Sequence, residues 1–370
     1  MKRSQIYRFL MSPIVPLLIV SNAMGKNAQV GTCLPHLQTY STISQAVAAV
    51  APGSTILVCP GTYPEQVTIT QPLTLRGVRS GNAANPTITV PPGGLTESVV
   101  APTNGVGMSF QILVQGTESE QVTISNIAVD GTSTMNAELG GWIAGIYYQN
   151  SSGTIRNVAT YGQNGNGYGF GIFLESTTTA AKTVTITHTN VHDFDADGIR
   201  SNALTQPPTL TVDIRSNLVV ITPSSTLQVN GVSIDGVGVI ADNLITAKPG
   251  LQGNRGIGIG SYSGMKISHN TVAGAGISIW PVADSNQVIS NRLSSADGGI
   301  VLSGKNNIVE HNSLLNISGA AISFNCTGTS NEVTHNTINE SDWGVASDPG
   351  GNAIAPNKFS NVTLIVTSPC

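Results

Sequence analysis

The chain has 370 residues, of which 10% are charged and 40% are hydrophobic, and its formal net charge is −4. Because no stretch concentrates lysine and arginine, the composition argues against a nucleic acid partner. Valine, isoleucine and leucine recur periodically, so the low charge does not indicate a disordered chain. We expect one long repetitive domain, since a solenoid grows in one dimension.

The first 25 residues predict a secretory signal peptide. Lys2, Arg3 and Arg8 precede an apolar stretch over residues 9–20, and small residues follow that stretch. The stretch is short for a membrane span and contains Pro13 and Pro16. We therefore expect a signal peptide over residues 1–25 and a secreted domain over residues 26–370. That domain is expected to be a monomer without a membrane span.

A single short helix is predicted near the start of this domain. Thr42-Ile-Ser-Gln45 resembles a capping box, and Ile43, Val47 and Val50 form an apolar stripe that ends before Pro52. We expect this helix to cover the N-terminal end of the solenoid, because the core would otherwise meet water there.

Four cysteines in an exported chain suggest two disulfides. Cys33 and Cys59 flank the predicted helix, and we expect them to be bonded to each other. Cys326 and Cys370 are the remaining pair. A bond between them would pin the last strand, and two free thiols are the alternative.

Short segments with alternating apolar residues follow the helix and are separated by Gly, Asn, Ser and Asp, which is typical of strands and turns. Two phrases interleave in them. The phrase apolar-x-x-Asn-x-apolar contains Asn217, Asn243, Asn270, Asn291, Asn312, Asn336 and Asn357. The phrase Gly-apolar-x-apolar begins at Gly145, Gly171, Gly231, Gly256, Gly276 and Gly299. The asparagines recur every 21 to 27 residues, a period that indicates a solenoid.

The recurring asparagine is interpreted as a structural residue. Equivalent residues of a solenoid stack about 4.8 Å apart, so their amides can hydrogen-bond from coil to coil. Asparagine also suits a tight turn because it tolerates a left-handed backbone. His188, His269, His311 and His335 stand just before this position or its equivalent. They are interpreted as turn residues, with a metal ladder at His311 and His335 as a less favoured alternative.

The segment Thr42–Gly53, followed by Pro60-Gly-Thr-Tyr63 and Gln71–Gly77, resembles the opening of the pectin lyase-like right-handed parallel β-helix superfamily. With the Asn phrases, the resemblance covers nearly the whole mature chain. It implies an all-β fold, a right-handed single-stranded parallel β-helix of about ten coils with a short N-terminal cap helix. The motifs of pectin methylesterases are absent, and Asp195–Ile199 matches only the first polygalacturonase motif. The resemblance is therefore specific for the fold and identifies no catalytic branch.

In this superfamily the cleft usually follows the first strand of each coil, which here is the Gly-apolar-x-apolar phrase. One outward column of that strand is expected to hold Tyr147, Phe173, Arg200, Ser233, Gly258 and Ser278. The next is expected to hold Gln149, Glu175, Asn202, Asp235, Gly260 and Trp280. Because sugar rings stack on aromatic faces, we predict a glycan surface here. Its predicted substrate-binding residues are Trp142, Tyr147, Phe173, Glu175, Asn202 and Asp235.

The loop His192-Asp-Phe-Asp-Ala-Asp-Gly198 carries the densest chemistry of the chain. Asp193, Asp195 and Asp197 match the first half of a calcium-binding loop, although its twelfth position is Leu204 instead of glutamate. Bound Ca²⁺ and a solvated acidic turn are both open interpretations.

A third interpretation makes this loop catalytic. His192, Asp195 and Asp197 would supply the acid and base, and Arg200 would neutralise developing charge. We expect an electrostatic role for Arg200, because arginine is a poor base.

Two functions remain open from the sequence. The first is a secreted polysaccharide lyase or glycoside hydrolase. The second is a non-catalytic β-helix that binds glycan or forms part of a cell surface. Both predict a polysaccharide or surface glycan as the partner, and the sequence does not decide whether the protein is an enzyme.

Overall fold

The computed structural model describes most of the domain. Its described residues are 26–79, 85–96, 99–116, 121–132, 141–205, 208–222, 228–247, 254–260, 264–326 and 328–366. The predicted signal peptide, residues 1–25, and Cys370 lie outside these residues.

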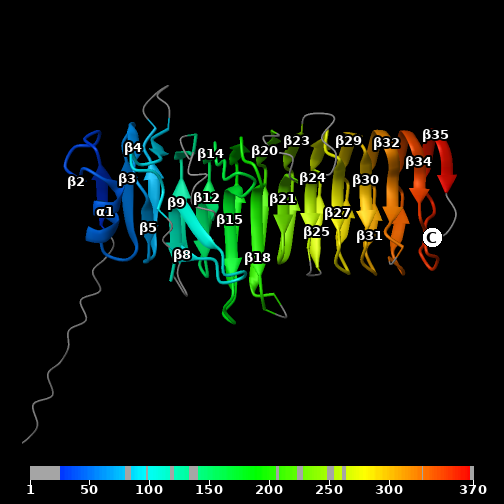
Figure 1. The fold of residues 1–370 in the computed structure, drawn as a ribbon, viewed down its shortest axis with the longest axis horizontal. Coiled ribbons are helices and arrows are strands. Elements are labelled where there is room, and N and C mark those ends of the chain that lie inside the picture. Colours follow the sequence, from blue (N-terminus) through cyan, green and yellow to red (C-terminus); the bar gives the residue numbers. More distant parts are fainter. Residues whose placement is uncertain are drawn as a thin grey trace, which may run out of the picture.

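The described chain winds into a long coil of three parallel strand ladders (Figure 1). The first ladder is a 13-stranded sheet with the order β2 (Gln38–Tyr40), β1 (Asn27–Val30), β3 (Ser54–Val58), β6 (Leu73–Gly77), β10 (Gln121–Ser125), β13 (Ser152–Arg156), β16 (Lys182–Thr187), β19 (Leu210–Arg215), β22 (Val237–Ala241), β25 (Met265–Ser268), β28 (Gln287–Ile289), β31 (Ile308–Glu310) and β33 (Glu332–Thr334).

The other two ladders form a sheet of 22 strands in the described residues. The second ladder contains β4 (Thr62–Pro64), β7 (Thr87–Thr89), β11 (Ala128–Asp130), β14 (Ala159–Tyr161), β17 (Asn190–His192), β20 (Leu218–Ile221), β23 (Leu244–Ala247), β26 (Thr271–Ala273) and β29 (Arg292–Ala296). The third contains β5 (Val67–Ile69), β9 (Gly107–Gln115), β12 (Trp142–Gln149), β15 (Gly169–Ser176), β18 (Asp197–Ala203), β21 (Asn230–Ile234), β24 (Arg255–Ile259), β27 (Ile277–Pro281) and β30 (Gly298–Leu302). The long strands β32 (Ser313–Phe324), β34 (Thr337–Ala346) and β35 (Lys358–Val366) continue both ladders. The short β8 (Val99–Val100) runs antiparallel to β9.

The alternation of apolar residues places one column of each strand inside the coil. In the first ladder, one fully buried column pairs in register from β10 to β33. It consists of Ile124, Ile155, Ile186, Ile214, Ile240, Ile267, Val288, Val309 and Val333, each 0% exposed. Stacked identical positions thus build one continuous core, as the periodicity predicts.

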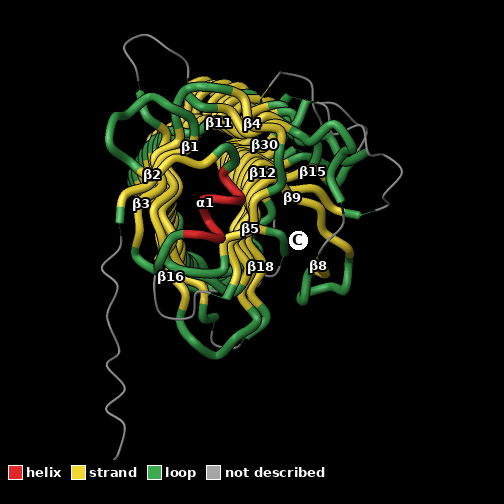
Figure 2. Tube along the Cα trace, turned by 90° about the vertical axis from the view of Figure 1, so that its left-hand side faces the viewer, coloured by secondary structure: helices red, strands yellow, loops and turns green. Residues whose placement is uncertain are grey.

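The helix α1 (Ile43–Ala49) lies across the N-terminal end of the coil (Figure 2). Its N-cap Thr42 accepts a hydrogen bond from the Gln45 N–H at 3.1 Å, the geometry that a capping box predicts. The helix buries Ile43, Ala46 and Val47 in the main core.

The expected asparagine ladder is present. The Oδ1 atom of Asn312 accepts hydrogen bonds from the backbone N–H and the Nδ2 of Asn291, at 2.9 and 3.0 Å. Asn312 in turn donates from the same two groups to Asn336 Oδ1, both at 3.0 Å. The pattern continues from Asn217 through Asn357. These side chains satisfy backbone groups that the turn would otherwise leave unpaired inside the protein.

One part of the turn prediction is wrong. The left-handed residue is the one before each ladder asparagine from Asn217 to Asn336; His269, His311 and His335 each have φ 58°. The asparagine itself points inward and is buried. The rings of His311 and His335 stack on the outside, with centroids 5.2 Å apart.

A second asparagine ladder escaped the sequence interpretation. Asn286 donates its backbone N–H to Asn307 Oδ1 at 2.8 Å, and Asn307 and Asn331 continue the chain of bonds to Asn352. Asn286, Asn307 and Asn331 each stand two positions before an apolar residue of the first ladder. That fixed offset is the signal that could have found them.

The disulfide between Cys33 and Cys59 is confirmed. Cys326 is also disulfide-bonded, and Cys370 lies outside the described residues. Within those residues no helix is long and apolar enough to cross a membrane.

Candidate functional site

A segment partly covers the outer face of the third ladder, and the sequence analysis did not predict this cover. Residues 99–106, here called the strap, contain β8 and the turn that leads into β9. Beneath the strap lies a second hydrophobic cluster outside the coil, separate from the main core. It contains Ala101, Met108, Phe110, Leu113, Ala144, Tyr147, Phe170, Phe173 and Ala196.

The prediction that Tyr147 and Phe173 present their rings to a glycan is wrong, because both side chains are 0% exposed. They do point out of the coil, in register with each other, and their ring centroids are 5.2 Å apart. Trp142 packs edge-on against Phe173 at 5.8 Å and remains half-buried. These aromatic rings therefore stabilise the strap and its surroundings.

Glu175 is also buried beneath the strap, with 2% exposure. Its carboxylate accepts hydrogen bonds from the Tyr147 hydroxyl and from the Thr103 N–H of the strap, the latter at 2.8 Å. Burial and the charge of Glu175 raise the pKa of Tyr147 well above its usual value. Glu175 thus fixes the strap to the sheet, and a substrate has no direct access to it in this arrangement.

Beyond the strap lies the outer face of β18, β21, β24 and β27, which we call the platform; Arg200, Ser233 and Trp280 on this face are half-buried. Asp197 lies at its edge with a 3% exposed side chain. Its carboxylate accepts hydrogen bonds from Arg200 Nη1 at 2.8 Å and Asn230 Nδ2 at 2.6 Å. Arg200 is 30% exposed and also donates from Nε to Asn202 Oδ1 at 3.1 Å. Asn202 reaches the strap through Thr103 Oγ1 at 3.2 Å.

Arg255 and Trp280 form the other end of the platform. The Arg255 guanidinium lies over the indole of Trp280, with its carbon 3.8 Å from the ring centroid. Burial lowers the pKa of Arg255, and the negative charge of Asp197 opposes that effect. The Arg255 Nε is buried without a hydrogen-bond partner among the described residues. Trp280 Nε1 donates to Ser303 Oγ at 2.9 Å, which fixes the ring.

The register of Trp280 differs from the expected one by two residues. It pairs with Gly258, so it belongs to the column of Arg200 and Ser233. Ser278 occupies the place that Gly256 holds on the preceding coil. That inward place accepts only a small residue, because a side chain at Gly256 would meet the backbone of the next coil. Serine is small enough, and the column of Arg200 therefore carries an aromatic ring on β27.

Asp235 completes the predicted column of Glu175 and Asn202. Its backbone N–H donates to Ser201, and its half-buried carboxylate lies directly over Gly260. A side chain at Gly260 would collide with that carboxylate. Among the predicted site residues, the structure thus brings Asp197, Arg200, Asn202 and Asp235 onto one sheet face.

The three aspartates of the predicted calcium loop do not converge. Asp195 is 3% exposed and accepts the backbone N–H groups of Gly167 and Gly169 at 2.7 and 2.6 Å. Asp197 faces the platform, whereas the exposed Asp193 accepts from Thr222 Oγ1 at 2.9 Å. No group of three metal-ligating residues forms among the described residues. The side chains present do not fit a shared calcium ion, because each carboxylate is directed to different partners.

We expect the Asp195→Asn variant to lose about 1–3 kcal/mol of unfolding free energy, since one of two buried N–H groups loses its acceptor. The loss should be the same with and without millimolar calcium, as followed by thermal unfolding. If calcium raised the melting temperature of the parent but not of the variant, that result would instead support the metal interpretation.

His192 lies apart from the platform, at the end of β17 on the second ladder. Its ring stacks on Tyr161 with centroids 4.9 Å apart, and its Nδ1 lies 2.7 Å from Asp193 Oδ2. The structure therefore does not group His192 with Asp195, Asp197 and Arg200 as one catalytic set.

The sequence interpretation missed Asn230 and Arg255. Together with Asp197 they form a register column, and each stands immediately before the glycine of its phrase. The residue preceding that glycine was the available signal. The sequence pattern did not predict the contact between Arg255 and Trp280, because the expected register placed the two residues in different columns.

Comparisons with known proteins agree with this architecture. The family described as "Right handed beta helix region" matches residues 211–363. A GH136 lacto-N-biosidase from Eubacterium ramulus superposes with a TM-score of 0.60 at 13% identity, over 91% of this chain and 68% of its own. A DFA-IIIase from Arthrobacter chlorophenolicus A6 gives a TM-score of 0.52 at 14% identity, over 78% of this chain and 74% of its own. A search of curated proteins finds no match.

Identities this low show the fold alone. The family match and the solved structures nevertheless agree with the ladders, the stacked core and the parallel register described above. The chain therefore has a right-handed parallel β-helix fold.

Proposed function

We propose that the protein is a secreted, carbohydrate-directed β-helix protein that binds an oligosaccharide or polysaccharide across the platform. The observation that carries the proposal is the Arg255 guanidinium stacked on Trp280 beside the Asp197–Arg200 pair. All four side chains extend from neighbouring strands of one sheet face.

This composition suits a sugar ligand. A pyranose offers an apolar face that packs on an indole and a rim of hydroxyls that need planar donors and acceptors. Arg200 supplies fixed donors, and Asp235 supplies an acceptor that occupies the space over Gly260. The platform holds these groups on strands rather than on loops, so binding orders few side chains.

The fold is compatible with this ligand class, since the lacto-N-biosidase and the DFA-IIIase are carbohydrate-active enzymes. Export is supported by the disulfide between Cys33 and Cys59, because such bonds persist in oxidising compartments. The signal-like sequence of residues 1–25 points to the same compartment.

Catalysis by hydrolysis or β-elimination is the second candidate, and the Asp197–Arg200 pair is the observation that favours it. Both oxygens of Asp197 already accept hydrogen bonds, and the side chain is almost fully buried. This arrangement suits a residue that positions Arg200 better than one that transfers a proton. A catalytic protein should lose turnover in both Asp197→Ala and Arg200→Ala while remaining folded.

The proposal is tested by titrating uronic-acid and neutral oligosaccharides into the protein in a calorimeter, and by following reducing ends and product absorbance. We expect Trp280→Ala to weaken binding at least tenfold, because the ring and the stacked Arg255 are lost together. Trp343→Ala is the matched control, since Trp343 is 42% exposed and lies on β34, three strands beyond β27 in the same ladder. Equal affinities of the parent and Trp280→Ala would remove the platform as the binding face.

A further inference from the structure

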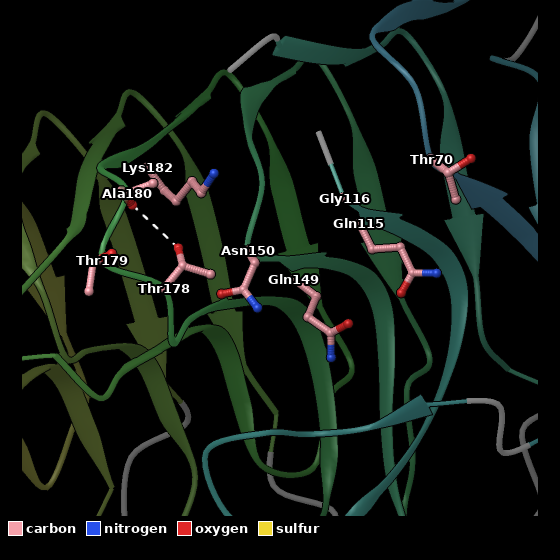
Figure 3. A pocket seen from close by; sticks show the side chains of 9 residues that line it. All are labelled: Thr70, Gln115, Gly116, Gln149, Asn150, Thr178, Thr179, Ala180 and Lys182. Atoms are coloured by element: carbon pink, nitrogen blue, oxygen red, sulfur yellow. Dashed lines mark hydrogen bonds between the residues drawn. The ribbon is translucent and has the colours of Figure 1, made fainter. Parts of the chain in front are cut away.

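A hollow of about 590 Å³ opens on the opposite side of the strap from the platform. It lies where β9 and β12 end, between these ends and the segment that follows β15 (Figure 3). Its lining includes Thr70, Gln115, Gln149, Asn150, Thr178 and Lys182. Its volume falls in the usual range for small-molecule sites.

The lining offers neutral hydrogen-bonding groups. Gln115 and Gln149 are in register on adjacent strands, so their amides stand side by side along one wall. Lys182 is the charged residue of the described lining, and it is 1% exposed. Among the described residues, no carboxylate or aromatic side chain lines the hollow. The described lining therefore offers amide and hydroxyl groups that suit the hydroxyl groups of a ligand.

The hollow is also held in shape. Gln149 Nε2 donates to the Tyr147 hydroxyl at 3.0 Å and to the strap carbonyl of Val100 at 3.3 Å. Asn150 Oδ1 accepts the Thr177 N–H at 2.8 Å, which fixes the segment after β15. The amide orientation of Gln149 is thus set before a ligand arrives, and preorganised groups bind at lower entropic cost.

We propose that this hollow binds a neutral saccharide unit, as a site separate from the platform. The Gln115 amide can donate and accept, and Gln149 adds its Oε1 as an acceptor because its N–H groups already donate to Tyr147 and Val100, which matches neighbouring hydroxyls of a sugar. The strap stands between the two sites, with its Thr103 bonded to Glu175 and Asn202. The inference therefore does not rest on the platform binding a glycan.

The test uses the Trp280→Ala protein, in which the platform is impaired, with neutral tetrasaccharides of glucose, mannose, xylose or galactose as probes. Calorimetry and saturation-transfer NMR should detect binding of at least one probe to this protein. Adding Ala180→Trp should weaken that binding at least tenfold, because the exposed Ala180 lines the hollow and an indole there fills it. Adding Ala181→Trp is the matched control, since Ala181 is equally exposed but does not line the hollow.

Gln115→Ala provides a second variant, and it should weaken binding without a change in melting temperature, because Gln115 is half-buried at a strand end. The proposal is overturned if none of the probes binds the Trp280→Ala protein. It is equally overturned if the Ala180→Trp and Ala181→Trp proteins bind alike. Failure of the platform proposal gives a different result, namely unchanged binding when Trp280 alone is replaced.

Discussion

Replacing Phe173 by alanine is expected to lower the free energy of unfolding by about 3–5 kcal/mol, the usual cost of deleting a fully buried aromatic ring. Phe173 is 0% exposed and contacts Tyr147, Phe170 and Trp142 within the cluster beneath the strap. The cavity would remove the apolar support of Ala101 in the strap. Denaturant unfolding of parent and variant measures the loss.

Tyr168→Ala is the control for this prediction. Tyr168 stacks on Trp142 in the same group of rings, at 6.5 Å between centroids, but it is 48% exposed. Its replacement should cost less than about 1 kcal/mol, as is usual for exposed positions. If Phe173→Ala unfolds at the same denaturant concentration as the parent, Phe173 is exposed in solution and the strap does not cover it.

Replacing Asn312 by alanine should cost about 3–6 kcal/mol, since several buried groups lose a partner at once. The backbone N–H and Nδ2 of Asn291 lose their acceptor. The carbonyls of Val288 and Glu310 lose a donor, at 2.8 and 3.1 Å. Thermal and denaturant unfolding provide the measurement.

Ser313→Ala is a matched control for the ladder, because Ser313 is the next residue and is exposed. It should unfold with the parent. If Asn312→Ala and Ser313→Ala had the same free energy of unfolding, the asparagine ladder would contribute nothing to stability. The stacked-turn account would then fail.

The coil could be predicted because its determinants are local and repeated. The column that contains Ile214 and Ile240 and the ladder that contains Asn217 and Asn243 each recur once per coil, so spacing alone reveals them. The capping of α1 by Thr42 is likewise determined by residues that are close in the sequence.

The site was harder to predict because its determinants are distant in sequence. Thr103 bonds Glu175 across 72 residues and Asn202 across 99, and no periodic signal announces such contacts. Alternation correctly directed Tyr147 and Phe173 out of the coil, but it could not show that the strap covers them. An outward position was therefore mistaken for an exposed one.

The three aspartates of the acidic loop do not converge in the structure for a related reason. Its spacing of aspartates matches a calcium loop, yet Phe194 between them is buried in the main core. That anchor directs Asp195 into the N–H groups of Gly167 and Gly169 rather than toward Asp193. Spacing predicts convergence only where the backbone is free to curl around an ion.

Hydrogen exchange with and without a saturating bound oligosaccharide tests the central claim, that the platform is the glycan-binding face, most directly. We predict that exchange slows in peptides covering β21, β24 and β27, where Arg255 and Trp280 lie. The first ladder, including β25 and β28, should exchange as in the free protein. Protection on the first ladder or at the asparagine turns, with none at β24 and β27, would contradict the account.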